Sequence, residues 1–215
     1  PVHLVEVSSF WMSRREITNT EFCRFLNERG NPVQDGVPWL DIRDPDCRIE
    51  YEAGLFIPEA GYEGHPVVEV SWNGAAAFAD WLGCRLPTEA EWEFTARNRG
   101  KELLFPTGGT LTFNHANIKG TAGADIWEKT SPVGSFSADE AGMFDMAGNV
   151  WEICSDWYNE DYYSRSPYLD PAGPDSGSVR SMRGGSWNYS RWSARTSARG
   201  MFDPEEPRDD VGFRI

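Results

Sequence analysis

The sequence contains few residues of the types that bind transition metals. It has three histidines and four cysteines in 215 residues, and no two cysteines have the CxxC spacing of zinc and thioredoxin-type sites. His3, His65 and His115 are far apart and match no paired spacing. The even number of cysteines is compatible with two disulfides or with four thiols. These cysteines are Cys23, Cys47, Cys84 and Cys154.

Basic residues are outnumbered by acidic ones. The chain has 20 Lys and Arg against 34 Asp and Glu, a net charge of −14. Nucleic acids and anionic membranes attract clustered positive charge, so we expect neither as a partner. No apolar run is long enough to span a bilayer and the first residues do not form a signal peptide, so we expect no membrane insertion. Arginines nonetheless gather near the C-terminus, where a site for an anionic or aromatic ligand remains open. They are Arg180, Arg183, Arg191, Arg195, Arg199, Arg208 and Arg214.

Only three short segments have the periodicity and start signals of helices. Residues 18–30 and 88–96 each open on a Thr-x-x-Glu capping box. Residues 71–83 open on a serine, whose hydroxyl caps helix N-termini. We therefore predict two or three helices, all in the first half of the chain.

Strand signals are weaker than the helix signals. Alternation of apolar and polar residues predicts a strand over 2–10, and residues 65–70 have an extended pattern. Residues 31–62 are rich in Pro, Gly and Asp, which predicts a long loop with one short strand. Nothing after Gly100 has a helical period. The pattern indicates an irregular α+β domain that occupies residues 1–215 in one piece.

Six blocks along the chain carry a resemblance to a known family. They are 16–22 (EITNTEF), 65–72 (HPVVEVSW), 85–93 (RLPTEAEWE), 142–152 (GMFDMAGNVWE), 183–187 (RGGSW) and 212–214 (GFR). In order and spacing they resemble the formylglycine-generating enzyme, or sulfatase-modifying factor, superfamily. The resemblance implies a loop-rich C-type lectin-like fold with two or three helices and short antiparallel strands. It does not imply an activity, because the scaffold serves both oxidative enzymes and non-catalytic binding proteins.

The residues of the family's oxidative chemistry are missing. The resemblance places the catalytic cysteine pair at Tyr189 and Ala194, and neither side chain ligates copper. No Cys or His occurs in 184–215, and the histidines do not match an iron site. We therefore expect no copper, no iron and no catalysis. One alternative is an enzyme or maturation factor with non-cysteine chemistry, although Ser186 has no evident base.

The segment 184–215 has the composition of a ligand-contacting surface. Aromatic residues and arginine supply anchors, while serine and asparagine supply adaptable hydrogen bonds. We expect Trp187 and Phe213, which lie in family blocks, to complete the core instead. The candidate contact residues are Asn188, Tyr189, Ser190, Arg191, Trp192, Arg195, Ser197, Arg199, Met201, Phe202, Asp203 and Glu205.

The resemblance also implies structural calcium, which loops can ligate through carboxylate, amide and carbonyl oxygens. One implied ligand set is Asn117, the Ile118 carbonyl, Asp125 and the Trp127 carbonyl. A second is Asp145, the Gly148 and Val150 carbonyls and Glu152. The alternative is that Asp145 and Glu152 only hydrogen-bond backbone amides in turns.

Within the superfamily, the chain is similar to the variable proteins of diversity-generating retroelements, a group with spirochaete (treponemal) members. Their C-terminal repeat is diversified between a Gly-Gly-Ser-Trp block and a Gly-Phe-Arg block. This similarity implies a non-catalytic protein that presents a variable face, here 184–215, to a protein or small-molecule ligand, and an extracytoplasmic position at the cell surface. A second alternative is a non-variable sensor or regulatory domain, fused elsewhere to a kinase or an anchor.

Overall fold

The computed structural model describes residues 3–215. Its three helices are α1 (Asn19–Arg29), α2 (Trp72–Trp81) and α3 (Glu89–Ala96). Both predicted capping boxes are present, at Thr18 and Thr88, and the Ser71 hydroxyl caps α2. The three predicted helices are therefore confirmed. Among the described residues, no helix has both the length and the hydropathy to cross a bilayer.

The region between α1 and α2 contains more strand than the sequence indicated. It forms two antiparallel hairpins, β1 (Val33–Gln34) with β2 (Val37–Pro38) and β3 (Ile49–Glu52) with β4 (Leu55–Pro58). Each hairpin turns through two residues with positive φ, as tight two-residue turns require. These residues are Asp35 and Gly36 in the first turn and Ala53 and Gly54 in the second. The prediction of one short strand is wrong because each of these residue pairs, which ends in glycine, forms a tight turn that brings its flanking residues together as a hairpin.

The strand predicted for residues 2–10 does not form in the described part of the segment, and Val2 lies outside that part. Residues 3–10 make a single bridge, between Glu6 and Leu169. Alternation was a misleading signal here because the segment packs against residues 168–170 through this one bridge, and no ladder extends from it within the described residues. Residues 65–70 likewise form isolated bridges only, and the positive φ of Glu69 interrupts them.

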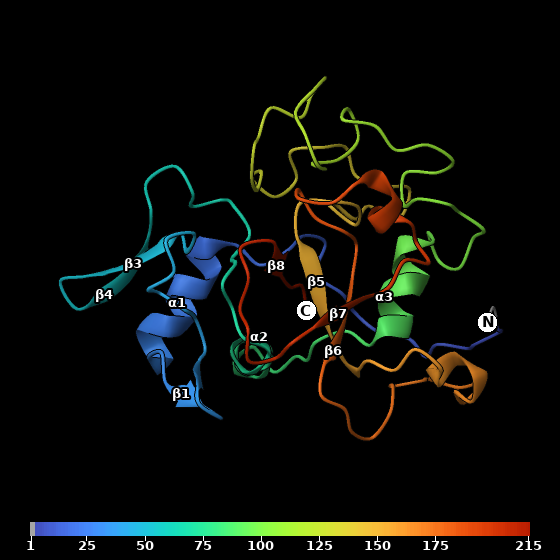
Figure 1. Cartoon of the computed structure of the whole chain (residues 1–215), viewed down its shortest axis with the longest axis horizontal. Coiled ribbons are helices and arrows are strands. Elements are labelled where there is room, and N and C mark those ends of the chain that lie inside the picture. The colour runs from blue at the N-terminus through green and yellow to red at the C-terminus, as the bar shows by residue number, and fades with distance from the viewer. Residues whose placement is uncertain (1–2) are drawn as a thin grey trace.

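A four-stranded sheet occupies the centre of the molecule (Figure 1). Its strands, in the order β7-β6-β5-β8, are Gly200–Phe202, Arg180–Arg183, Trp151–Trp157 and Val211–Gly212. Two 3-10 turns, η1 (Tyr162–Ser164) and η2 (Arg191–Ala194), lie in the connections. The fold is α+β, as expected. It differs in one detail: β8 pairs with β5 in parallel, while the other ladders are antiparallel.

Aromatic residues from α1, α2 and the C-terminus form the main core. Phe22 and Phe78 both pack edge-on against Phe213, at centroid distances of 6.0 and 5.4 Å. Phe213 is fully buried, as predicted, whereas Trp187 is only half-buried. Aromatic pairs in this geometry add about 0.5–1.5 kcal/mol beyond the area that they bury.

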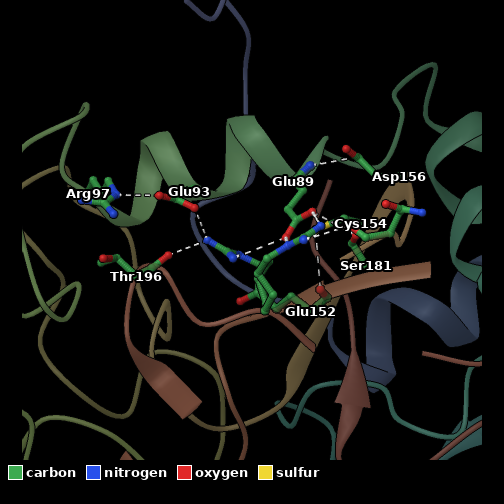
Figure 2. A network of polar contacts seen from close by, with 11 residues as sticks. Glu89, Glu93, Arg97, Glu152, Cys154, Asp156, Ser181 and Thr196 are labelled. Atoms are coloured by element: carbon green, nitrogen blue, oxygen red, sulfur yellow. Dashed lines mark hydrogen bonds and ion pairs between the residues drawn. The ribbon is translucent and has the colours of Figure 1, made fainter. Parts of the chain in front are cut away.

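Two fully buried arginines bind the sheet to the helices and loops. Arg183 of β6 contacts Glu89 at 3.4 Å and Glu93 at 2.5 Å, both on α3 (Figure 2). Burial opposes the ionisation of Glu89, yet hydrogen bonds from Arg199 and the charge of Arg183 outweigh it and lower the pKa of Glu89. A buried charge without such partners would cost several kcal/mol. The Gly-Gly-Ser block is therefore held by ion pairs at its start.

The second buried arginine anchors the C-terminus. Arg214 forms a two-pronged ion pair with Glu152 of β5, with N···O distances of 2.5 and 2.6 Å. The indole of Trp92 donates a third hydrogen bond to Glu152, at 2.6 Å. Both charged side chains have no exposed surface. The last family block is thus fastened to the central strand.

Candidate ligand-binding face

The candidate face begins at a sharp turn after β6. Gly184 and Gly185 have φ values of +99° and +74°, which side-chain-bearing residues rarely adopt. A Cβ on Gly185 would lie 3.0 Å from the backbone of Ser193 and Ala194. The glycine pair therefore allows η2 to pack against the turn, and this contact fixes the segment between them.

Ser186 lies beneath the face and does not form a catalytic triad. It is 1 % exposed, and its hydroxyl donates to Asp210 Oδ2 at 2.9 Å. Burial raises the pKa of Asp210, and the paired Arg208 counteracts this shift. The histidines hydrogen-bond elsewhere, to the hydroxyls of Thr130, Thr112 and Ser166. Ser186 therefore positions the turn, and no histidine is placed to deprotonate it.

Tyr189 occupies the first position that the resemblance assigns to a catalytic cysteine. Its ring packs edge-on against Trp151, at 5.6 Å between centroids and 81° between planes. Its hydroxyl accepts a hydrogen bond from Arg208 at 3.4 Å, and its side chain is partly exposed. The Trp151 indole N–H is buried and has no hydrogen-bond partner in the part of the chain that the structure describes. The other assigned position, Ala194, is 1 % exposed and belongs to a small apolar cluster.

The neighbouring polar and aromatic side chains point into solvent. Trp192 is 57 % exposed, with one edge near Phe105 at 6.1 Å between centroids. Arg191 and Arg195 donate only to backbone carbonyls, of Leu111 and Trp192, and form no ion pair in the described structure. We call the exposed part of this segment the aromatic face. It consists of Asn188, Tyr189, Ser190, Arg191, Trp192 and Arg195.

The remaining candidate contact residues lie elsewhere. Phe202 is fully buried in the main core, so we remove it from the candidate face: on strand β7 its side chain points inward. Arg199 is held by Glu89 at 2.7 and 2.8 Å and lines a separate cavity with Ser197. The last three candidate contact residues are exposed on β7 and in the loop that follows it. They are Met201, Asp203 and Glu205.

The first calcium set has oxygen atoms that suit a hard cation. Asn117 Oδ1 is buried without a hydrogen-bond partner among the described residues. Asp125 is 1 % exposed, and burial raises its pKa. Its oxygens accept hydrogen bonds from the backbone N–H groups of Ile118 and Trp127. Residues 3–215 contain no metal-binding cluster of three or more His, Cys, Asp or Glu side chains. Calcium here would therefore combine the one carboxylate of Asp125 with amide and carbonyl oxygens, and the residues fit it.

The second calcium set does not fit a metal in this arrangement. Both oxygens of Glu152 already accept hydrogen bonds from Arg214. Asp145 Oδ2 accepts one from the Gly134 backbone at 2.6 Å. Burial and the nearby carboxylates Asp145 and Glu152 raise the pKa of Glu16 well above its ordinary value. The cation of this cluster is Arg214, which already engages both oxygens of Glu152, the carboxylate that the second set requires.

The four cysteines are thiols in this structure. Cys154 is fully buried, which raises its pKa well above the usual value. Burial also raises the pKa of Cys23 and Cys47 to about 12. Because the thiolate is the reactive form, these three thiols are poor nucleophiles.

Three residues beside the aromatic face were absent from the sequence-based set. Trp151, Arg208 and Asp210 contact Tyr189 or Ser186 directly. A signal existed for each of them, because Trp151 lies within the family block 142–152 and the other two lie within four residues of the terminal block. Their proximity to residue 189 follows only from the parallel pairing of β8 with β5.

Comparison with known proteins identifies the family. A model of the sulfatase-modifying factor enzyme 1-like domain matches residues 1–215. The chain belongs to this family. It is 38% identical over its whole length to the serine/threonine-protein kinase Pkn1 of Chlamydia trachomatis, of which it spans 34%. It is also 34% identical to a formylglycine-generating enzyme of Streptomyces coelicolor, with 100% of this chain and 80% of that protein aligned.

The family members that resemble this chain differ in activity. An inactive C-alpha-formylglycine-generating enzyme 2 of Mus musculus is 37% identical over 69% of this chain and 48% of its own length. Among solved structures, variable protein 1 of Treponema denticola matches with a TM-score of 0.72 and 25% identity, covering 98% of this chain and 84% of that one. The scaffold is thus shared by proteins named as enzymes, as an inactive paralogue and as a variable protein.

Proposed function

We propose that this domain is a non-catalytic binding module that contacts its ligand through the aromatic face. The observation that carries the proposal is the environment of Tyr189. At a position that the resemblance assigns to a catalytic cysteine, a partly exposed tyrosine packs on Trp151. An aromatic ring held rigidly beside exposed arginines has the properties of an interaction hot spot.

The proposed ligand is a protein or small molecule with anionic or aromatic groups. Arg191 and Arg195 are exposed and unpaired with carboxylates in the described structure, so they can bind such groups. We further propose that the segment is diversified and acts at the cell surface, outside the cytoplasm. Support comes from the T. denticola variable protein, which shares the fold. A template repeat beside the gene, identical to the coding sequence of 184–215 except at adenines, is the expected genomic sign, and a gene without one contradicts diversification.

The experiment compares two triple-alanine variants. The first removes Tyr189, Arg191 and Trp192. The matched control removes Trp11, Arg43 and Tyr51, which are exposed residues of the same three types. Peptides selected from a random library on the wild-type protein serve as probes.

We expect the first variant to lose about tenfold or more in affinity, because hot-spot truncations cost about 2 kcal/mol or more. The control should bind normally, and both should unfold at nearly the wild-type midpoint. Equal affinity of the wild type and the first variant for every selected peptide would remove the aromatic face as the binding site.

A second candidate function is supported by the chlamydial relatives. The chain aligns over its whole length with about a third of a protein named as a kinase. A non-variable domain of this type would sense a ligand and regulate an attached kinase. The sequence of the complete gene tests this directly, because the regulatory function requires kinase motifs in the same open reading frame. If they are present, the first triple variant should change kinase activity, while the control variant should not.

A further inference from the structure

A cavity of about 680 Å³ lies on the α3 side of the molecule, separate from the aromatic face. It is enclosed by the N-terminal segment, α3, η1 and the end of β5. Ligand sites commonly have volumes of about 300–1,000 Å³. Three tyrosines and a phenylalanine supply much of its wall: Tyr158, Tyr162, Tyr163 and Phe94.

A buried carboxylate lines this cavity. Asp156 is only 3 % exposed, and its Oδ2 accepts hydrogen bonds from the Glu89 backbone at 2.9 Å and from Ser155 at 3.2 Å. Figure 2 shows the first of these contacts, at the start of α3. Asp156 forms no ion pair with any described residue. The nearby Arg180 is held between the rings of Trp72 and Trp157 and donates to the Ser155 carbonyl instead.

The unpaired charges around the cavity are carboxylates. Both lining arginines are already paired, Arg97 with Glu93 and Arg199 with Glu89, although these two glutamates also pair with Arg183. Glu102 and Glu160 also line the cavity and, like Asp156, lack an ion pair in the described part of the chain. A cation that entered would therefore gain unshared negative charge, whereas an anion would meet repulsion.

The aromatic wall already holds one cation, the side chain of Arg199. The guanidinium of Arg199 lies 4.6 Å from the Tyr158 ring and 4.2 Å from the Tyr163 ring. Attraction of this kind strengthens where water is excluded. Aromatic rings and a buried carboxylate together favour a ligand with one positive group and an apolar body.

We propose that this cavity binds an organic cation, a primary amine or guanidinium on an apolar body, whose charged group pairs with Asp156. Burial raises the pKa of Asp156 to about 7, and a bound cation would stabilise the carboxylate form. The source of the cation is a free amine or a basic side chain of another protein. This site is independent of the aromatic face and does not rest on the proposed function.

The experiment uses the full chain and three simple probes. Phenethylamine carries the positive group, 2-phenylethanol is its neutral counterpart, and a short lysine-containing peptide represents a protein side chain. Calorimetry measures each affinity for the wild type, for Asp156→Asn, and for Ala90→Trp, which fills the cavity from α3. Asp80→Asn, an exposed aspartate at the end of α2, is the matched control.

We expect saturable binding of phenethylamine or of the lysine peptide. The affinity for 2-phenylethanol should be about tenfold lower than that for phenethylamine, because the alcohol lacks the charge-assisted hydrogen bond to Asp156. Asp156→Asn should remove the difference between amine and alcohol, and Ala90→Trp should abolish binding of both, while Asp80→Asn changes neither. Binding of phenethylamine would identify a free amine as the source of the cation, and binding of the lysine peptide would identify a basic side chain of another protein.

Three results would overturn the proposal. The first is a wild-type protein that binds no cationic probe at up to about 1 mM. The second is an alcohol that binds as well as the amine. The third is normal amine binding by a folded Asp156→Asn or Ala90→Trp variant. The comparison of amine with alcohol uses the wild type alone, so the test stands even if a variant fails to fold.

Discussion

The same residue types have opposite roles in the central sheet and in the aromatic face. In the sheet, Arg183 and Arg214 are fully buried and each pairs with glutamate. In the aromatic face, Arg191 and Arg195 are exposed and, within the described residues, form no ion pair: they donate to backbone carbonyls, and Arg191 also lies 6.0 Å from the Trp192 ring. A charge removed from water must be paired, whereas an exposed charge is free to bind a ligand. Substitutions of the buried arginines in the sheet should therefore reduce folding stability, whereas substitutions of the exposed arginines in the face should change it little.

The largest predicted effect is at the C-terminal ion pair. Arg214→Ala leaves Glu152 buried without its cation, which we expect to lower the free energy of unfolding by about 3–5 kcal/mol. Arg191→Ala is the matched control and should change it by less than about 0.5 kcal/mol. Urea denaturation measures both. Similar stability of the two variants would contradict the division between sheet and face.

Two adjacent residues of β7 give the next comparison. Phe202 is fully buried and Met201 is 62 % exposed. We expect Phe202→Ala to cost about 3–5 kcal/mol through the cavity that it creates, and Met201→Ala to cost almost nothing. Thermal unfolding of the two variants measures the difference. A mild Phe202→Ala variant with impaired ligand binding would return Phe202 to the face.

Calcium should stabilise the loops that support the face. At about a hundred times its dissociation constant, a ligand that binds only the folded state adds about 2.7 kcal/mol. Asp125→Asn should remove this gain, and Asp80→Asn should preserve it. The measurement is the shift in melting temperature when calcium is added to a chelator-treated protein. An unchanged shift in Asp125→Asn would exclude the first ligand set.

A smaller effect concerns the pH dependence of stability. Burial, reinforced by Asp44 and Asp209, raises the pKa of Glu69 from 4.5 to about 8. The folded state therefore binds this proton more tightly than the unfolded chain. The resulting stability is complete below about pH 4.5 and is lost as the pH rises through about 8.

Glu69→Gln should flatten this decline, because the amide stays neutral throughout. The exposed Glu50→Gln is the control. Denaturant unfolding at several pH values between about 4.5 and 8 measures the slope for each protein. A wild-type slope in Glu69→Gln would show that Glu69 ionises normally.

The helices were predictable because their start signals are local: each capping residue acts within one turn of its own position. The exposure of Tyr189 and Trp192 was also predictable, because the composition of the segment 184–215 indicates a ligand-contacting surface. The parallel pairing of β8, by contrast, depends on contacts about 60 residues apart, between Trp151 and Val211. No local pattern indicates it.

Long-range pairing also decided which predicted contact residues are exposed. Arg199 was expected in the face because arginine commonly anchors ligand contacts. Its bidentate contact with Glu89, which lies on α3, instead places it in the cavity wall. The cavity itself joins the N-terminal segment to α3 and η1, and the six family blocks contain no hint of that contact.

The most direct measurement of non-catalytic function is oxygen consumption by the purified protein in the presence of copper(I) and a cysteine-containing peptide. Because Tyr189 and Ala194 stand where the resemblance places the catalytic cysteine pair, we predict no turnover above the protein-free rate. Copper-dependent oxidation of the peptide that is abolished by Ser186→Ala or Tyr189→Ala in a folded protein would contradict the claim that this face binds without catalysing.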